Sequence, residues 1–341
     1  DAARFSVLVF GGSQGARAIN EAMISALPHM DSHRDLLFIT HQTGETDFEK
    51  IKAGYAAAGW ESADVRSYIK DMMGEFEKAA RELEETLKLT PGDYDAEYTL
   101  GLCFLKKKDL AKAKELYGRM VERLGNRPAL RVLIGRAYRE TGFLPESIEE
   151  FKKAIELDPR FPRVHYYLGL TYLYKDGAAK IPDAIEEFKI ELAANPEEYF
   201  ANFYLGILYI MERKFEPAIA LLEKAVSKQP NNPDPYFHLG QAYQGAGKHK
   251  EAVEVLQKTI ALTPSLEHND YQVTTAHYRL GQSLIKVGRT AEGEKELQIS
   301  QELKSKGFKL DEKRVGAFLS GNNSHDQSGK ELVKAEGVIA E

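Results

Sequence analysis

One hydrophobic phrase recurs along the chain, from about Gly101 to Pro264 and once beyond. Each copy has an apolar residue before a glycine, a large apolar residue three positions after it, a small one twelve after it and a bulky one sixteen after it, allowing three inserted residues in the third copy. Successive glycines are 34, 34, 37, 34 and 41 residues apart. Such offsets place apolar side chains on one face of each of two successive helices, which predicts amphipathic helical hairpins. The six phrases are Leu100-Gly101, Ile134-Gly135, Leu168-Gly169, Leu205-Gly206, Leu239-Gly240 and Leu280-Gly281.

The glycine and the small residue are expected where the two helices of a hairpin come closest, because a larger side chain there would hold the axes apart. Prolines then close four of the units: Pro159, Pro196, Pro230 and Pro264. One hairpin cannot bury its apolar face alone, so neighbours must stack. The phrase resembles the tetratricopeptide repeat, a helix-turn-helix unit of about 34 residues. That resemblance implies a mostly α protein built as a right-handed α-solenoid.

The array is predicted over residues 74–306, as a half unit followed by six units, the last of which has weakened signals. Insertions after Lys175 and Pro264 are expected to lengthen loops without breaking the stack. Residues 307–341 form a third segment. Within it Leu310 to Leu319 is predicted as a capping helix, and the polar stretch from Gly321 onward as disordered.

The first 73 residues have a different rhythm. The apolar run Phe5 to Phe10 precedes a glycine-rich turn and a helical pattern, and two further strands are predicted at 36–40 and 65–69 with a helix at 48–58 between them. Strands that alternate with helices indicate parallel pairing, here a three-stranded, half-Rossmann-like sheet. Such a sheet needs cover on both faces, so we expect it to pack against the first repeat helix.

Several short motifs in this segment resemble a known enzyme family. They are Leu8-Val-Phe-Gly-Gly-Ser-Gln-Gly-Ala-Arg17, Ile19-Asn-Glu21, His41-Gln-Thr-Gly44 and Tyr68-Ile-Lys-Asp-Met72. Together they resemble the bacterial peptidoglycan N-acetylglucosaminyltransferases that convert lipid I to lipid II, over about residues 4–73. The resemblance implies the beginning of the UDP-sugar-binding, carboxyl-terminal half of a GT-B glycosyltransferase. It places Gly12, Ser13, Gln14 and Gly15 at the donor diphosphate and Ile69 beside the uracil. His41 and Gln42 match a motif but receive no chemical role.

The departure from that family is as informative as the match. After Met72 the chain turns into a repeat helix, without the later donor-binding segments or the acceptor domain of the family. A glycine turn before a helix favours an anion, but one such turn cannot replace two domains that close over donor and acceptor. We therefore expect no transferase activity, no catalytic residues and no cofactor, with weak UDP-sugar binding as the remaining ligand expectation.

Composition narrows the choice of partner. A net charge of −6 with no visible lysine and arginine stripe argues against nucleic acid. No apolar run approaches the roughly 18 residues that span a bilayer.

The single cysteine, Cys103, cannot form an internal disulfide, which fits a reducing, cytoplasmic compartment. The histidines are scattered over helix faces with no cysteine or carboxylate set, so no metal site is expected.

Binding is expected on the concave face, which the first helix of each unit lines. Positions three before and one after each repeat glycine are mostly apolar or aromatic, which suits an amphipathic helix or an extended peptide. Arginines on the amino-terminal side are candidates to hold a carboxylate. The alternative is that several of the aromatic residues pack between neighbouring repeats. The predicted groove residues are Tyr98, Leu102, Arg136, Arg139, Arg163, Tyr166, Leu170, Leu173, Phe200, Phe203, Ile207, Ile210, Phe237, Gln241 and Tyr278.

Two functional hypotheses remain. The first is a non-catalytic scaffold that binds a peptide or partner protein in the groove. The second is a glycosyltransferase-derived protein that still binds UDP-N-acetylglucosamine and is recruited by its repeats to peptidoglycan (lipid II) synthesis machinery. The sequence does not distinguish a natural join at about Met73 from an engineered or accidental fusion.

Overall fold

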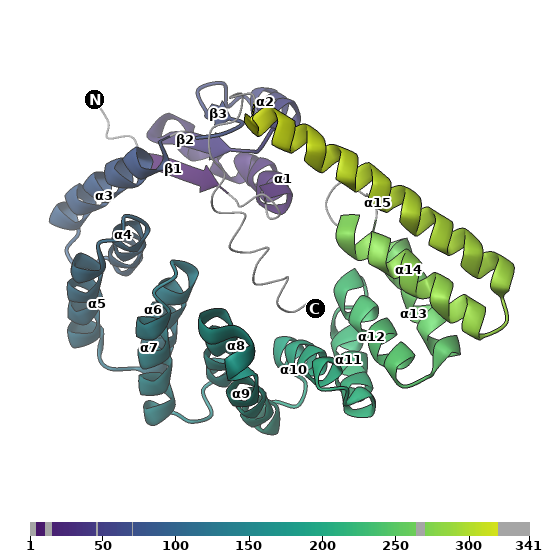
Figure 1. The fold of residues 1–341 in the computed structure, drawn as a ribbon. Coiled ribbons are helices and arrows are strands. Elements are labelled where there is room, and N and C mark those ends of the chain that lie inside the picture. Colours follow the sequence, from purple (N-terminus) through teal and green to yellow (C-terminus); the bar gives the residue numbers. More distant parts are fainter. Residues whose placement is uncertain (1–4, 11–15, 46, 70, 264–269, 320–341) are drawn as a thin grey trace. The chain divides into compact units, whose positions relative to one another are not determined.

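A computed structural model describes most of the chain (Figure 1), namely residues 5–10, 16–45, 47–69, 71–263 and 270–319. The chain divides into an amino-terminal unit, residues 1–150, and a carboxy-terminal unit, residues 151–341, with the boundary inside one helix. Each unit is described by itself.

The amino-terminal unit begins with a three-stranded parallel sheet in the order β1-β2-β3, as the sequence predicts. Val7 is in register with Ile39, and Thr40 with Asp64. The third strand ends at Arg66, earlier than predicted, and beyond it the Ile69 backbone N–H donates to the side chain of Gln42. The elements are β1 (Phe5–Phe10), α1 (Ala16–Ala26), η1 (Leu27–Leu36), β2 (Leu37–Gln42), α2 (Phe48–Ala57) and β3 (Asp64–Arg66).

Both faces of this sheet are covered. Alternate side chains such as Val7 and Ile39 point into a core with η1 and α2, which contains the single tryptophan, Trp60. The intervening side chains meet α3 (Met72–Leu89): the ring of Phe76 lies edge-on to Phe10 at 5.6 Å, and the Lys78 ammonium lies over Phe38 at 5.7 Å. The predicted packing of the sheet on the first repeat helix is confirmed.

The repeats of the amino-terminal unit follow directly from α3. They comprise α4 (Tyr94–Lys106), α5 (Leu110–Leu124), α6 (Pro128–Glu140) and α7 (Leu144–Leu157), the last crossing the unit boundary. α3 packs on α4, α4 on α5 and α4 on α6. Their shared core includes Leu105, Tyr117 and Met120, each at most 2% exposed. Asp93 and Asp109 cap α4 and α5 by accepting hydrogen bonds from the backbone of the first turn.

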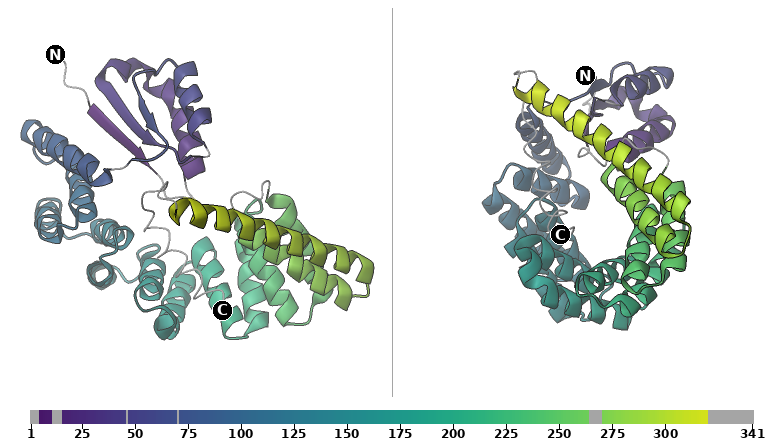
Figure 2. Two further views of the ribbon diagram at one scale, coloured as in Figure 1. Left: turned by 45° about the horizontal axis from the view of Figure 1, so that its top comes forward. Right: turned by 45° about the vertical axis from the view of Figure 1, so that its right-hand side comes forward.

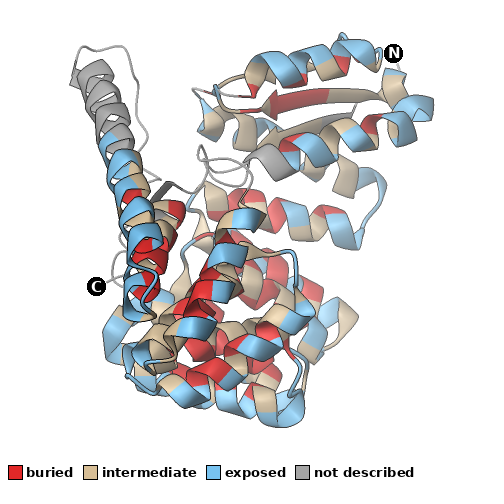
Figure 3. Ribbon diagram, turned by 90° about the vertical axis from the view of Figure 1, so that its right-hand side faces the viewer, coloured by how far each residue is buried: buried red, intermediate tan, exposed pale blue. Residues whose placement is uncertain are grey.

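The carboxy-terminal unit continues the same hairpin pattern. Its elements are α8 (Val164–Asp176), η2 (Gly177–Lys180), α9 (Ile181–Ala194), α10 (Tyr199–Met211), α11 (Phe215–Lys228), α12 (Pro233–Gly245), α13 (His249–Leu262), α14 (Asp270–Lys286) and α15 (Thr290–Leu319). Each helix packs on the next in sequence order, and buried positions recur along these helices (Figure 3). The insertion after Lys175 forms η2 and leaves α8 and α9 packed together. The segment 310–319, predicted as a further helix, lies within α15, which continues past Gly307 because a single glycine weakens a helix by only about 1 kcal/mol.

The repeat glycines occupy the close approach that the sequence predicts. A Cβ atom on Gly169 would lie 2.8 Å from Cε1 of Phe188 and 3.2 Å from the backbone oxygen of Ala184. On Gly240 it would lie 2.7 Å from Leu256. Within each hairpin, these first-helix glycines therefore pack directly against the small and bulky residues of the second helix. Five of these small residues are fully buried, namely Ala113, Ser147, Ala184, Ala218 and Ala252.

Candidate functional site

Three first helices of the carboxy-terminal unit carry large apolar side chains that are well exposed. Tyr174 on α8, Met211 on α10, and Tyr278 with Ile285 on α14 are 48%, 36%, 49% and 38% exposed. Only Tyr278 of these four was among the predicted groove residues. Tyr174 and Met211 both lie five residues after a repeat glycine, one position beyond the predicted residues Leu173 and Ile210, and that spacing was the signal available for finding them. We refer to these four residues as the first-helix surface.

Several predicted groove residues lie in the core instead. Tyr166, Leu170, Ile207 and Phe237 are only 6%, 6%, 8% and 6% exposed. Tyr166 stacks on Phe200 with ring centres 5.3 Å apart, so it joins two neighbouring hairpins. These four side chains offer little area to a ligand, which agrees with the alternative that the aromatic positions pack between repeats.

The remaining predicted residues of this unit are partly or well exposed. The ring of Phe203 is stacked on Tyr199 at 5.9 Å and edge-on to His238 at 5.5 Å. Burial lowers the pKa of His238, whose Nδ1 lies 3.0 Å from the Gln241 side-chain oxygen. Phe203 thus has a packing role as well as an exposed edge. The other partly exposed members are Leu173, Phe200, Ile210 and Gln241.

Arg163 is held by its neighbours before any ligand arrives. It has a positive φ of 65° at the start of α8, a conformation that costs a non-glycine residue of order 1 kcal/mol. Its Nε lies 3.1 Å from Glu198 Oε1, and its guanidinium lies 5.6 Å from the centre of the Phe200 ring. The Glu198 side chain is only 2% exposed, so Arg163 neutralises a buried carboxylate. This pairing leaves less of its charge for the anionic ligand that the sequence suggested.

A second buried glutamate, Glu191, stabilises the start of α8. Glu191 on α9 accepts hydrogen bonds from the backbone N–H groups of Arg163, at 2.9 Å, and Tyr166, at 3.4 Å. It therefore caps α8 from another helix, where no side chain of the helix start does so. Burial raises the pKa of Glu191, and the two N–H groups oppose that rise. Sequence patterns gave no signal for this contact, because its partners are 25 and 28 residues away.

In the amino-terminal unit the predicted groove residues are Tyr98, Leu102, Arg136 and Arg139, all partly exposed. The Tyr98 ring stacks on Tyr117 at 6.2 Å, and burial raises the pKa of Tyr98 to about 12. Arg136 lies 3.8 Å from Glu140, its neighbour one helical turn later.

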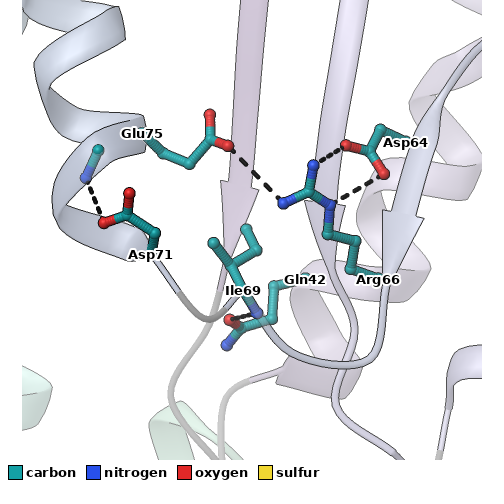
Figure 4. Close-up of polar contacts among 7 residues, drawn as sticks. Gln42, Asp64, Arg66, Ile69, Asp71 and Glu75 are labelled. Carbon is teal, nitrogen blue, oxygen red and sulfur yellow. Dashed lines mark hydrogen bonds and ion pairs between the residues drawn. The ribbon is translucent and has the colours of Figure 1, made fainter.

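The predicted nucleotide-sugar residues lie only partly within the described structure. Gly12, Ser13, Gln14 and Gly15 lie outside the described residues. Ile69 is 1% exposed, and its backbone N–H donates to Gln42 Oε1 at 2.8 Å (Figure 4). Gln42 is the last residue of β2 and Ile69 follows β3, so both lie at the carboxyl ends of strands, the edge at which open α/β sheets bind ligands.

The neighbouring polar contacts fix the path of the chain into the repeats. Arg66 pairs with Asp64 and lies 3.8 Å from Glu75, and Asp71 caps α3 by accepting from the Gly74 N–H at 2.8 Å.

His41 has a structural environment. Its Nδ1 lies 3.0 Å from the Tyr55 hydroxyl and its Nε2 lies 2.9 Å from Asn20 Oδ1, while Asn20 also donates to Asp47 and to the Thr43 carbonyl. Burial lowers the pKa of His41 to about 4, so the ring is neutral near pH 7. This hydrogen-bond network links β2 to α1 and α2. It gives a structural role to residues of two of the motifs that resemble the transferases, Ile19-Asn-Glu21 and His41-Gln-Thr-Gly44.

Among the described residues, no group of three or more His, Cys, Asp or Glu side chains is placed to hold a metal ion. Within the same part of the chain, no helix combines the length and apolarity that crossing a membrane requires.

Family models match the chain in consecutive segments. Residues 6–80 match the glycosyltransferase family 28 C-terminal domain. Residues 72–137, 135–176 and 174–233 match tetratricopeptide repeats, and residues 211–299 match subunit 3 of the anaphase-promoting complex, or cyclosome. The first two matches overlap over residues 72–80, which is the first half of α3.

Individual relatives match the amino-terminal segment. The UDP-N-acetylglucosamine–N-acetylmuramyl-(pentapeptide) pyrophosphoryl-undecaprenol N-acetylglucosamine transferase of Syntrophotalea carbinolica is 51% identical over 73 residues, which is 21% of this chain and 20% of that protein. The transferase of the same name from Pelobacter propionicus is 54% identical over 76 residues, 22% of this chain and 20% of that protein. The chain therefore spans about a fifth of the length of these relatives.

Solved structures with detectable likeness include MamA proteins. MamA from Desulfovibrio magneticus RS-1 is 20% identical, with a TM-score of 0.46 over 53% of this chain and 97% of that one. Another MamA crystal structure is 26% identical, with a TM-score of 0.45 over 53% of this chain and 94% of that one. From the family models, the chain joins a segment of the glycosyltransferase family 28 C-terminal domain to an array of tetratricopeptide repeats, and α3 takes part in both.

Proposed function

We propose that the carboxy-terminal unit is a protein-interaction scaffold that holds an apolar segment of a partner against its first-helix surface and performs no catalysis. The observation that carries this proposal is the exposure of Tyr174, Met211, Tyr278 and Ile285 on first helices. Isolated exposed apolar residues are ordinary, but repeated exposure on equivalent helices of a repeat array is typical of an interaction surface.

The chemistry of the surface indicates the kind of segment. Its four defining residues are uncharged, and Arg163, which precedes the first residue of α8, is already paired with Glu198. An amphipathic helix or an extended apolar peptide would bury the exposed tyrosine and methionine side chains. Methionine adapts to irregular partners, while tyrosine adds a hydroxyl that can remain in water.

The test uses peptides selected from a displayed random library against the intact chain, then measured by fluorescence anisotropy. Tyr174→Asp and Met211→Asp should each weaken binding by about tenfold or more, which corresponds to about 1.4 kcal/mol. Ile190→Asp is the matched control, because Ile190 is 38% exposed on the second helix α9. Equal losses in all three variants, or none in the first two, would contradict the proposal.

A substitution at the predicted groove residue Phe203, such as Phe203→Asp, would be a poorer test. The ring of Phe203 contacts Tyr199, Tyr204 and His238, so a charge there would disturb packing as well as binding.

A second function is favoured by the match of residues 6–80 to the glycosyltransferase family 28 C-terminal domain and by the 51% identity to one transferase over 73 residues. We infer that this segment retains weak affinity for UDP or UDP-N-acetylglucosamine without turnover, and that the repeats would then recruit it to peptidoglycan synthesis machinery. The resemblance places Ile69 beside the uracil. Its backbone N–H donates to Gln42, so a nucleotide that used this N–H would have to displace that side chain.

Calorimetry with UDP and with UDP-N-acetylglucosamine tests this second function. Heat that is present in the wild type and absent in Gly12→Val supports it. An equal heat of binding in the wild type and in Gly12→Val, or no heat of binding in either protein, would contradict the second function. Release of UDP from UDP-N-acetylglucosamine would show catalysis.

A further inference from the structure

The outer edge of β1 is unpaired by any strand of the described residues. β1 is hydrogen-bonded to β2 alone, and it lies at one side of the sheet (Figure 2, left). Its sequence, Phe-Ser-Val-Leu-Val-Phe, contains no charge and no proline. Such a continuous apolar run is typical of a strand in the middle of a parallel sheet, with neighbours on both sides.

Burial shows the consequence of that position. Val7, Leu8, Val9 and Phe10 are all only partly buried, although α1, α2 and α3 cover the two faces of the sheet. In the central strand β2, Ile39 and His41 are 1% and 0% exposed. The apolar side chains of β1 lack a neighbouring strand rather than a covering helix.

The opposite edge of the sheet is protected. β3 has only three residues, and its Asp64 and Arg66 side chains pair with each other while remaining partly exposed. Short length and charge are the usual devices that prevent strands from adding to an edge. The sheet therefore has one edge that resists pairing and one that has no such protection.

The topology explains why β1 is left in this state. A doubly wound sheet has the strand order 3-2-1-4-5-6, in which the first strand is central. Here the chain leaves β3 for α3 and the repeats, so no described strand follows that could take the fourth position. α3 replaces the helix cover of the sheet but does not supply backbone partners for β1.

We propose that β1 pairs antiparallel with β1 of a second copy of this chain, giving a continuous six-stranded sheet across a two-fold axis. A second copy fits because each chain brings one unprotected apolar edge, and a two-fold contact uses both at once. The outer edges of the resulting sheet are the two β3 strands, so the assembly stops at two copies.

The same symmetry restricts the register. A two-fold axis perpendicular to the sheet keeps α1 and α2 of both copies on one face, which requires side chains of the same face to lie opposite each other. Of the registers that satisfy this condition, the two that pair the most residues of β1 place Val7 opposite Val7 of the second copy, or Leu8 opposite Leu8.

Sedimentation velocity of the intact chain from about 1 to about 100 μM tests the association, the range in which a moderate homodimer dissociates. The expected result is a monomer that converts to a dimer with rising concentration. A monomer throughout, or growth beyond two copies, would overturn the proposal.

Cysteine cross-linking tests the strand that mediates it. In a Cys103→Ala background, either Val7→Cys or Leu8→Cys should form a disulfide-linked dimer on mild oxidation, because opposed cysteines on antiparallel strands meet the distance requirement. Asp64→Cys on the protected edge is the matched control and should remain monomeric. Fluorescence of Trp60 reports whether each variant keeps the fold of the segment. If neither β1 variant cross-links while folded, or Asp64→Cys does so equally, β1 pairing is wrong.

Discussion

His165 has a hydrogen-bond acceptor at each ring nitrogen. Nδ1 lies 2.6 Å from a Glu187 carboxylate oxygen and Nε2 lies 3.0 Å from the Pro159 carbonyl oxygen. Only the protonated ring can donate to both. Burial opposes the charge, but the two acceptors outweigh it and hold the pKa of His165 above its usual value.

This arrangement makes stability depend on pH in a defined direction. A histidine whose pKa is higher in the folded state than in the unfolded state stabilises the fold. This contribution is complete below the unfolded-state pKa of about 6.5 and is lost as the pH rises through the folded-state pKa. Urea unfolding should therefore show the wild type losing more stability between pH 5.5 and pH 9 than His165→Gln, by about 1 kcal/mol. Equal losses in the two proteins would show that His165 is not protonated in the folded state.

A second residue-scale feature is the turn between the two helices of a unit. The position seven after the repeat glycine has a positive φ in five units, with glycine at Gly142, Gly247 and Gly288 but Lys108 and Arg213 in the others. Arg213 is exposed, whereas Lys108 donates to the Thr141 carbonyl and lies over the Phe143 ring.

Replacing Arg213 by glycine should relieve backbone strain at little cost in contacts. We expect Arg213→Gly to raise the free energy of unfolding by up to about 1 kcal/mol. Lys108→Gly should gain less, because it also loses the Thr141 and Phe143 contacts. Thermal unfolding of the two variants decides this, and a destabilised Arg213→Gly would contradict it.

At the scale of the elements, the helix hairpins follow from the sequence phrase because both partners in each contact lie within one unit. Gly169 and Phe188 are 19 residues apart, and the phrase records both. The burial of Tyr166 and Phe237 was left open, because helical periodicity places a residue on a face but not against a particular neighbour.

Gly169 and Gly118 both lie in helices, but they differ in the space available for an added methyl group. Gly169→Ala would press a methyl group on the buried ring of Phe188 and the backbone of Ala184, which should cost about 1–3 kcal/mol. Gly118 lies in α5 with nothing within 4 Å of an added Cβ. Gly118→Ala should therefore stabilise the protein by up to about 1 kcal/mol. Urea unfolding measures both, and similar effects of the two changes would refute the packing argument.

At the scale of the whole molecule, the sheet and the repeats have separate cores. Trp60 belongs to the core between the sheet, η1 and α2, while the core of α3 to α6 is built from other residues. The stability of a repeat array comes from contacts between neighbouring units. A three-stranded sheet with a partly buried edge strand has a different source of stability, so the repeats and the sheet need not unfold at the same urea concentration.

Two probes should therefore report different unfolding transitions. Trp60 fluorescence should change at lower urea than far-ultraviolet circular dichroism, which is dominated by the repeat helices. Phe76→Ala removes the ring that contacts Phe10 and should lower the fluorescence midpoint by more than the dichroism midpoint. Coincident transitions in both proteins would mean that the sheet and the repeats unfold as one unit.

The sequence by itself determined the series of helical hairpins and the parallel strands, because helical and strand periodicities are local and each hairpin buries its face against its immediate neighbour. Tertiary structure alone decided that Glu191 caps a helix from 28 residues away and that β1 lies at an edge. These features depend on contacts between distant segments, and a residue's local pattern is the same whether or not such a neighbour is present.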